Sequence, residues 1–387
     1  SVLNILMPNF SRSNKFNIHM DLDRSEKSSI YNMNEGRYIL DFFGMYASCP
    51  LGFNHAAFKS ASYQRELLAA SHIKVTNCAI SSDISLSFDK QFSEFAPSQF
   101  KYKYYCCTGS LAVESAIKTA LEAYKKPNPK IITFPKSFHG GNAWGSFFTS
   151  REKPVDKVVG GYPRNYVVQC NESIESVMDA NYHHNIAAVL IEPLRSTFGD
   201  IKFDREFLKE LNSFCKSRNI PIIVDEIQTG MGATGTYWFY EQLPIDPDIV
   251  IFGKKAQLSG IMVTEKLSEI FNQDGCKLEV TWDATLFDMI MCKQIIKAYQ
   301  KLDILDNVKK RANQLINGIT NPRIKNLRNE GLLIGFDLDT ESERDLFQED
   351  CYKKGLLVNT AGSTTIRLRP NLAVNKSEIS QALEIIN

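Results

Sequence analysis

Short apolar runs alternate with amphipathic stretches along the middle of the chain. Nearly every position of these runs is apolar, a pattern typical of strands that are buried on both faces. The amphipathic stretch Arg205–Arg218 lies between two of them and predicts a crossover helix. The chain is therefore predicted to form a doubly wound, mostly parallel α/β sheet. The runs are Ile131–Phe134, Tyr166–Gln169, Ala187–Ile191, Pro221–Val224 and Ile249–Phe252.

The C-terminal part of the chain has a different pattern. A long amphipathic segment, residues 291–319, precedes alternating short strands and helices, which predicts a compact α+β unit. The segment 1–60 contains one clear strand pattern, Arg37–Phe43, but is too short to form a core of its own. We expect it to pack on the C-terminal unit. The later elements are expected at Leu332–Asp337, Glu341–Lys354, Thr364–Arg369 and Lys376–Ile386.

Length and composition agree with two domains. The chain has 387 residues, of which 43% are hydrophobic, and this is enough to bury two cores. We expect a large α/β domain over residues 61–287 and a smaller, discontinuous α+β domain over residues 1–60 and 288–387.

Charge and cysteine content argue against several classes of function. Lys and Arg total 45 and Asp and Glu 44, so the net charge is +1, and we expect no nucleic-acid partner. No apolar run approaches the roughly twenty residues that span a bilayer, and the first residues lack the order of a secretory signal. The nine cysteines include no C-x-x-C pair. We therefore expect a cytoplasmic protein with reduced thiols, no metal site and no membrane partner.

Two carboxylates end the apolar run that reaches Val224. Asp225 and Glu226 follow that run directly, and Gln228 and Gly230 come next. Ligands bind at the carboxyl ends of strands in open α/β sheets. Asp225 can hold a protonated ring nitrogen there, and Gln228 can contact a ring hydroxyl. A helix cap or a loop acid would give the same pattern.

Two lysines follow the next apolar run, after Gly253. An amine that is buried near cations or apolar groups loses its proton readily and becomes a nucleophile for carbonyl groups. Lys254 and Lys255 are therefore candidate nucleophiles. A solvated pair of lysines at a strand end is the alternative interpretation.

Two further segments could bind a flat, phosphorylated ligand. Gly109 and Ser110 open a predicted helix, where free backbone N–H groups favour a phosphate, although Ser is also a common helix cap. Phe138 and His139 follow the run Ile131–Phe134, so the Phe138 ring can stack on a flat ligand at the same sheet edge or pack in the core.

Taken together, these segments resemble the class III, fold-type I aminotransferases, and among them most closely the lysine ε-aminotransferase branch. The similarity extends over nearly the whole chain, and the VDE-x-QTG and GKK blocks are its most specific parts. The resemblance implies a large domain with a seven-stranded type of sheet, and pyridoxal 5'-phosphate as cofactor. The segments are TGSLAVESAIKTA, SFHG, IEP, VDEIQTGMGATGTYW, PDIVIFGKKAQLSG, TWDATLFDM and IRLRPNLAV.

The resemblance also implies a role for each matching residue. Lys255 should form the Schiff base and shuttle the proton, and Asp225 should keep the pyridine nitrogen protonated, which makes the ring an electron sink. Arg367 should bind the carboxylate of a keto acid, usually 2-oxoglutarate, through paired hydrogen bonds. The remaining cofactor contacts are expected from Gly109, Ser110, Phe138, His139 and Gln228, and from Thr281 of the neighbouring subunit in a homodimer whose active sites lie at the interface.

The chain departs from the family pattern around the substrate. Thr197 stands where a Glu usually covers the keto-acid arginine, and Gly141 stands where the lysine branch has an Arg for the donor carboxylate. Tyr46 matches a substrate-contacting Tyr of ornithine aminotransferases. Glu192 and Arg195 are expected near the substrate, and Arg195 either replaces a lost anchor or faces the surface. We therefore expect a lysine- or ornithine-like donor that is not ordinary lysine.

Two alternatives remain open at this stage. An aminomutase, racemase, epimerase or lyase of the same fold would keep Asp225, Gln228 and Lys255. A non-catalytic, cofactor-binding regulator would usually add a DNA-binding segment with a basic bias, and the sequence has none.

Overall fold

The structure is a computed structural model that describes residues 16–73, 80–150, 166–272 and 277–387. Its centre is a seven-stranded sheet with the order β4-β12-β11-β10-β7-β5-β6. Only β12 is antiparallel to its neighbours, which confirms the predicted mostly parallel sheet. The strands are β4 (Tyr102–Cys106), β5 (Pro129–Thr133), β6 (Val167–Gln169), β7 (Asn185–Ile191), β10 (Ile222–Asp225), β11 (Ile249–Phe252) and β12 (Ser259–Val263).

Helices cover both faces of this sheet. Alternate residues of one strand point to opposite faces, so Ile223 joins the core beneath α5 (Gly109–Ala123). Its neighbour Val224 joins the core on the other side, together with Leu208 of α8 (Arg205–Arg218). Burial on both faces explains why these strands are apolar throughout. Other elements of this part are α3 (Ala61–Ala70), α4 (Asp83–Phe95), α6 (Ala143–Phe148), α7 (Ile174–His183), β8 (Leu194–Arg195) and β9 (Ile201–Lys202).

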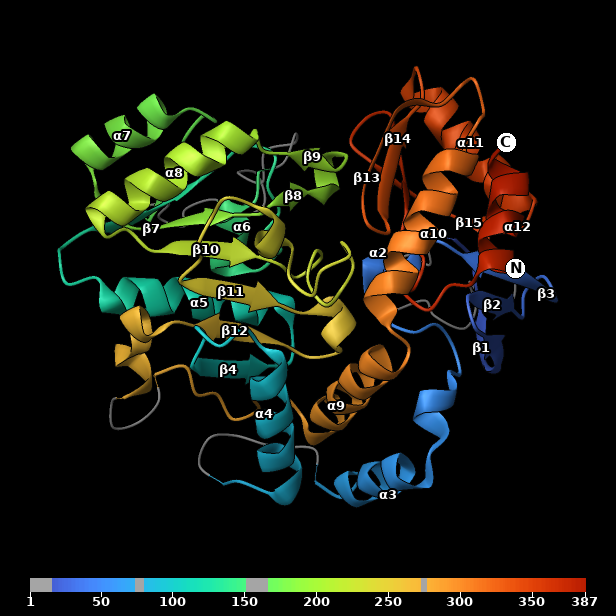
Figure 1. Ribbon diagram of the computed structural model, residues 1–387, viewed down its shortest axis with the longest axis horizontal. Helices are drawn as coiled ribbons and strands as arrows, with labels where there is room; N and C mark the ends of the chain where they lie inside the picture. Colours follow the sequence, from blue (N-terminus) through green and yellow to red (C-terminus); the bar gives the residue numbers. More distant parts are fainter. Residues whose placement is uncertain (1–15, 74–79, 151–165, 273–276) are drawn as a thin grey trace.

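The two ends of the chain meet in a second part of the molecule. Figure 1 shows the blue N-terminal strands beside the red and orange C-terminal elements. β15 (Leu356–Leu357) pairs in parallel with β3 (Arg37–Asp41), within the sheet β1-β2-β3-β15. A separate sheet has the order β13-β14-β17-β16. The strands are β1 (Met20–Glu26), β2 (Ser29–Asn32), β13 (Lys325–Glu330), β14 (Leu333–Asp337), β16 (Asn359–Ala361) and β17 (Thr365–Leu368).

The long amphipathic segment 291–319 lies in two helices, α9 (Leu286–Lys301) and α10 (Ile304–Gly318). The chain turns between them at Asp303, whose φ of 47° is left-handed and ends the helical hydrogen bonding. The remaining helices are α2 (Gly44–Ala47), α11 (Glu341–Lys353) and α12 (Lys376–Ile386), and the short 3₁₀ turns are η1 (Ala56–Lys59), η3 (Ser196–Phe198), η4 (Phe239–Gln242), η5 (Lys254–Ala256) and η6 (Glu265–Phe271).

Three structural observations bear on the classes of function considered above. Among the described residues, no helix is both long and apolar enough to cross a bilayer. The same residues contain no cluster of three His, Cys, Asp or Glu side chains with the geometry of a metal site. All seven cysteines in the described part of the chain are free thiols.

Candidate active site

A cavity of about 240 Å³ opens at the carboxyl ends of the central strands. Its walls come from the start of α5, the segment after β5, and the residues that follow β7, β10 and β11. This is the edge at which open α/β sheets bind ligands. The structure thus brings together six residues that the sequence predicted for the site: Gly109, Ser110, Phe138, Glu192, Asp225 and Gln228.

One end of the cavity suits an anion. Thr108 caps α5 by accepting from the N–H of Leu111, at 3.3 Å, and the first intrahelical bond begins only at Ala112. The N–H groups of Gly109 and Ser110 therefore lie at the positive end of the helix without an intrahelical acceptor. A side chain at position 109 would collide with Ile227, 2.9 Å away, so glycine keeps the backbone accessible.

The opposite wall carries a buried carboxylate. Asp225 is 4% exposed, and its Oδ2 atom lies 2.9 Å from Nδ1 of His139. His139 itself is fully buried behind Asp225 and does not line the cavity, so it orients the carboxylate from behind. Glu226 points the other way, as alternation along the strand requires, and accepts N–H groups from Phe239 and Tyr240. Asp225 therefore faces the cavity, while Glu226 fixes the loop that contains Phe239 and Tyr240.

Gln228 is held by a second arginine that sequence analysis missed. Arg369 donates through Nε to Oε1 of Gln228 at 3.1 Å, and it also pairs with the buried carboxylate of Asp200. With its oxygen occupied, Gln228 presents its amide nitrogen to the cavity as a donor. Arg369 lies two residues after Arg367 of β17, so the two guanidinium groups share one side of that segment. That spacing was visible in the sequence.

The two adjacent lysines lie in different surroundings. Lys254 lines the cavity with Asp225 and Glu192. The Nζ atom of Lys255 instead donates to the backbone carbonyl of Ala47 at 2.5 Å, outside the cavity lining. The 3₁₀ turn η5 and the left-handed φ of 47° at Lys254 send consecutive side chains in different directions. The structure therefore places Lys254, and not the predicted Lys255, at the site.

Loss of contact with water shifts the pKa values of two ionisable side chains that line the cavity, Lys254 and Glu192. Partial removal of its amine from water, together with the nearby Arg367 guanidinium, lowers the pKa of Lys254 to about 7. Burial, together with the Asp225 carboxylate, raises the pKa of Glu192 to about 8, although Glu192 accepts from the Phe138 N–H at 2.7 Å. A lysine with a pKa near neutrality can act as a nucleophile and as an acid or base.

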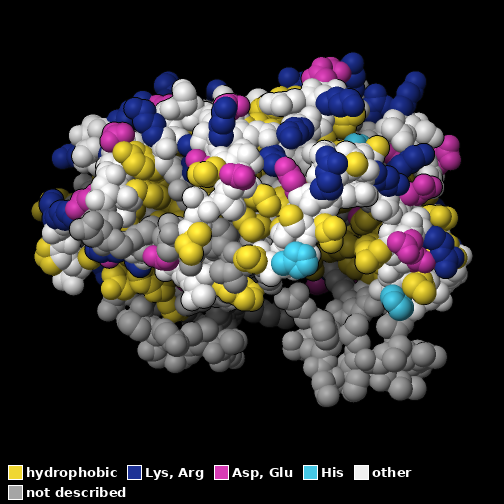
Figure 2. All heavy atoms as spheres, turned by 90° about the horizontal axis from the view of Figure 1, so that it is seen from below, with side chains coloured by type: hydrophobic (Ala, Val, Ile, Leu, Met, Phe, Trp, Pro, Cys, Tyr) yellow, Lys and Arg dark blue, Asp and Glu magenta, His cyan; other side chains and the backbone are white. Residues whose placement is uncertain are grey.

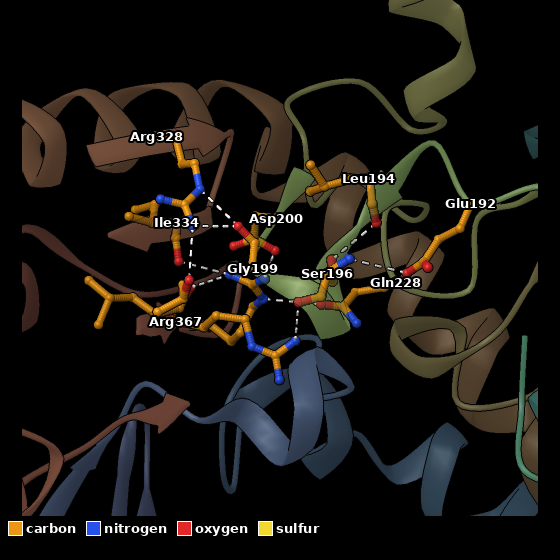
Figure 3. A network of polar contacts seen from close by, with 12 residues as sticks. Glu192, Leu194, Ser196, Gly199, Asp200, Gln228, Arg328, Ile334 and Arg367 are labelled. Carbon is orange, nitrogen blue, oxygen red and sulfur yellow. Dashed lines mark hydrogen bonds and ion pairs between the residues drawn. The ribbon is translucent and has the colours of Figure 1, made fainter. Parts of the chain in front are cut away.

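Arg367 lies just beyond the cavity lining and is 7% exposed. Its Nη1 atom donates to the carbonyl of Ser196 at 2.9 Å, and the Ser196 N–H donates to Glu192 at 3.3 Å, as Figure 3 shows. Thr197, which replaces the usual masking Glu, is exposed. A backbone carbonyl thus contacts the guanidinium where a carboxylate was expected from the family pattern.

Tyr46 sits on a left-handed turn near Arg367. Gly44 to Ala47 all have positive φ, and a left-handed backbone costs each non-glycine residue about 1–2 kcal/mol. The turn leaves Tyr46 54% exposed, with its ring centroid 4.6 Å from that of Phe43. At Gly44 the turn packs against the backbone carbonyl of Arg369, two residues after Arg367. The structure therefore brings together the two residues that were predicted to contact substrate.

Arg195 does not line the cavity. Its side chain is 1% exposed, pairs with Glu172, and lies over the ring of Phe203 at 4.2 Å. It also donates to the backbone carbonyls of Pro135 and Lys202, at 3.2 and 3.0 Å. The burial of Arg195 contradicts the surface alternative raised from the sequence, and Arg195 is not part of the cavity lining. Arg195 ties the β8–β9 hairpin to neighbouring loops.

A substitution of Arg195 distinguishes a structural role from a role in substrate binding. We expect Arg195→Met to lower the free energy of unfolding by about 2 kcal/mol, less than the roughly 3–5 kcal/mol of a fully buried pair, because Glu172 is partly exposed. Thermal unfolding measures this loss, and the exposed Arg218→Met provides the matched control. A substrate KM that rises while stability stays unchanged would instead restore the substrate-anchor role.

Thr281 lies away from the cavity of its own chain. It is exposed, and its neighbours Val280 and Trp282 are 42% and 46% exposed. Within one subunit Thr281 therefore contributes nothing to the cavity described above.

Known proteins align with this sequence over nearly its full length. The sequence model of the aminotransferase class-III family matches residues 10–387. The L-lysine-epsilon aminotransferase of Amycolatopsis lactamdurans is 26% identical over 411 residues, covering 96% of this chain and 91% of the relative. A 4-aminobutyrate aminotransferase of Schizosaccharomyces pombe is 28% identical, covering 91% of this chain and 85% of the relative.

Solved structures agree with the sequence comparisons. Lysine aminotransferase from M. tuberculosis in the internal aldimine form superimposes with a TM-score of 0.92 at 25% identity, covering 99% of this chain and 97% of that one. The ornithine aminotransferase from Toxoplasma gondii superimposes with a TM-score of 0.87 at 19% identity, covering 99% of this chain and 93% of the other. The second likeness shows the fold alone.

Proposed function

The chain belongs to the class-III aminotransferases, enzymes that transfer an amino group with pyridoxal phosphate, and we propose which residues bind the cofactor and what kind of donor it uses. The observation that carries the proposal is that Lys254 and Asp225 face one cavity whose far end is the start of α5. The relatives act on different amines, so membership alone leaves the donor open.

The residues of the cavity fit the cofactor. The N–H groups of Gly109 and Ser110 would hold its phosphate, the buried carboxylate of Asp225 its protonated ring nitrogen, and the amide of Gln228 its phenolic oxygen. Phe138 lies at the wall and is 37% exposed, so its ring can cover the cofactor ring. When bound, the cofactor supplies an electron sink for the carbon that loses a proton.

Lys254, rather than Lys255, is the proposed Schiff-base lysine. Its amine lines the cavity, and its lowered pKa leaves a large neutral fraction near pH 7, which nucleophilic attack on a carbonyl requires. The same amine can then take a proton from the substrate carbon and return it. Glu192 and Asp225 lie close enough to Lys254 to influence its charge. Lys255 has no access to the cavity lining.

The substrates are proposed from the groups around Arg367. A keto acid such as 2-oxoglutarate would bind with a carboxylate on Arg367, which has a buried guanidinium and an unpartnered Nε atom. The donor would be a lysine- or ornithine-like amine or a modified relative. Gly141 offers no side chain for a donor carboxylate, and the exposed Thr197 cannot mask Arg367 as a Glu would. These two differences support a donor other than ordinary lysine.

Arg367→Met tests the acceptor site. We expect the KM for 2-oxoglutarate to rise roughly a hundredfold, because a carboxylate would lose its paired hydrogen bonds to a buried guanidinium. Arg328→Met, which removes another arginine of the C-terminal sheet outside the cavity lining, is the matched control and should change this KM little. A KM that is unchanged in Arg367→Met would disprove the assignment.

A donor panel tests the reaction itself. With purified protein and pyridoxal phosphate, one class of amine should bleach the visible band, and 2-oxoglutarate should restore it. Lysine that performs as well as every other donor would contradict the donor proposal. A product that forms without any keto acid would identify a mutase, racemase, epimerase or lyase instead, because only a transaminase needs a second substrate.

We also propose a cytoplasmic homodimer with active sites at the subunit interface. The free thiols of the described cysteines support a reducing compartment. Thr281 would contact the partner's cofactor phosphate, and its exposed neighbours Val280 and Trp282 support a position at the interface. Figure 2 shows hydrophobic side chains on the face seen from below. Leu68 of α3 and Leu86 of α4 are also 68% and 59% exposed. Exposed apolar surface of this kind marks interaction sites.

The predicted domain boundaries become part of this proposal. Residues 61–287 would form the large domain, and residues 1–60 and 288–387 the small one. The parallel pairing of β3 with β15 supports the second grouping, because it joins the two separate segments in one sheet.

A further inference from the structure

The turn that carries Tyr46 has an unusual backbone. Gly44, Met45, Tyr46 and Ala47 have φ values of 56°, 50°, 57° and 67°, so three consecutive non-glycine residues are left-handed. Such a run does not persist unless its surroundings hold it, and strained segments of this kind gather at ligand sites. The contacts that hold the turn therefore indicate what it is for.

The start of the turn is fixed by buried groups. Oδ1 of Asp41 accepts the N–H groups of Phe43 and Gly44, each at 2.9 Å. A side chain at position 44 would lie 2.2 Å from the carbonyl oxygen of Arg369, so only glycine fits against the end of β17. Asp41 is 2% exposed, so water does not compete for these hydrogen bonds.

The end of the turn is held by hydrogen bonds from the loop that contains Lys254. Nζ of Lys255 donates to the carbonyl of Ala47 at 2.5 Å. Nε2 of Gln257 donates to the carbonyl of Ser48 at 2.7 Å. Two side chains of one short segment thus bind two successive carbonyls of the turn.

The same turn places a phenol beside the substrate arginine. Tyr46 packs edge-to-face on Phe43, and its turn packs at Gly44 against the backbone carbonyl of Arg369, two residues after Arg367. In Figure 3 the blue ribbon of the N-terminal segment runs next to the labelled Arg367. A carboxylate bound to Arg367 would therefore lie close to Tyr46.

We infer that Lys255 is a positioning residue that holds the turn Gly44–Ala47, and through it Tyr46, beside Arg367. It thereby sets how tightly a substrate carboxylate binds, while Lys254 performs the chemistry. The inference rests on the proposed function, since it assumes that Arg367 binds a carboxylate. The second lysine of the pair thus has a role of its own, because it couples the loop of the catalytic lysine to the substrate-recognition turn.

The test variant is Lys255→Met, which keeps the length of the side chain and removes its donor. In the holoenzyme we expect the cofactor band to persist, the KM for 2-oxoglutarate to rise about tenfold, and kcat to change by less than about threefold. Tyr46→Phe should raise the same KM. The double variant should be no worse than the worse single variant, because both changes disturb one contact.

A second readout does not depend on turnover. In the cofactor-free protein, hydrogen exchange of a peptide spanning residues 43–49 should be faster in Lys255→Met than in the wild type. Gln257→Leu removes only the hydrogen bond to the Ser48 carbonyl. It should raise the exchange rate and the KM by smaller amounts than Lys255→Met, and it replaces that variant in the test if Lys255→Met does not fold.

The outcomes are distinguishable. Unchanged exchange and unchanged KM in Lys255→Met would overturn the positioning role, and so would additive effects in the double variant. Loss of the cofactor band in Lys255→Met, with the band kept in Lys254→Ala, would instead overturn the proposed assignment of the Schiff-base lysine. A lower folding stability of Lys255→Met with an unchanged KM would show that Lys255 only stabilises the fold, and would also overturn the positioning role.

Discussion

Replacing Lys254 with alanine is expected to abolish the visible absorption band of the lysine-linked cofactor and to lower kcat by about 10⁴-fold or more. The amine supplies both the covalent link and the proton transfer, and the other lysine of the pair is held by the Ala47 carbonyl. Absorption spectra of the purified variant with added pyridoxal phosphate measure the first effect, and single-turnover kinetics with a donor measure the second.

Lys255→Met is the matched control for this prediction. It removes the other amine of the pair, one residue away and 2% exposed, and should keep the band. The opposite pattern, with the band lost only in Lys255→Met, would show that Lys255 forms the Schiff base, as the sequence predicted.

The low pKa of Lys254 adds a pH dependence to the same experiment. Below its pKa of about 7 the amine is protonated and cannot attack the cofactor aldehyde. The rate at which the cofactor-free protein forms the band should therefore rise from about pH 6 to about pH 8 and then level off. A rate that still climbs steeply near the pKa of an ordinary lysine would mean that burial does not depress the pKa.

Asp225→Asn is expected to lower kcat by about 10³-fold while the cofactor still binds. An amide has nearly the shape of the carboxylate and can still contact His139, but it carries no charge to keep the ring nitrogen protonated. Steady-state kinetics at saturating cofactor measure the loss, and the spectrum should show a cofactor band at a changed position.

Glu226→Gln controls for the effect of altering any buried acid in this segment. Glu226 accepts two backbone N–H groups and the Thr229 hydroxyl away from the cavity. The change should lower the free energy of unfolding by about 1–3 kcal/mol and leave kcat close to that of the wild type. Equal losses of kcat in both variants would remove the special role of Asp225.

The buried strands could be predicted because burial on both faces makes them continuously apolar. β10 and β11 were found in this way. The strand β4 was missed because Lys103 interrupts its tyrosines, and β12 because it begins with Ser259 and Gly260, which favour a turn in a single sequence. In both strands, pairing with neighbours outweighs local preference.

Part of the site was equally predictable. Asp225 and Gln228 follow a buried strand, so the sheet edge alone places them. The choice between Lys254 and Lys255 depends on a left-handed residue inside a short turn, which no periodicity reports. The buried position of Arg195 depends on its ion pair with Glu172, which is distant in sequence and becomes a neighbour only after folding.

The joining of the two chain ends has a consequence for biosynthesis. Arg37, on β3, donates to the carbonyl of Tyr352, a residue 315 positions later. At about 5–20 residues per second, a ribosome needs roughly 15–60 s to make that stretch. Throughout this interval β3 has no parallel partner, and the segment that carries Tyr46 has no β17 to pack against. A nascent chain therefore acquires its central sheet first and its substrate-recognition groups only as translation ends.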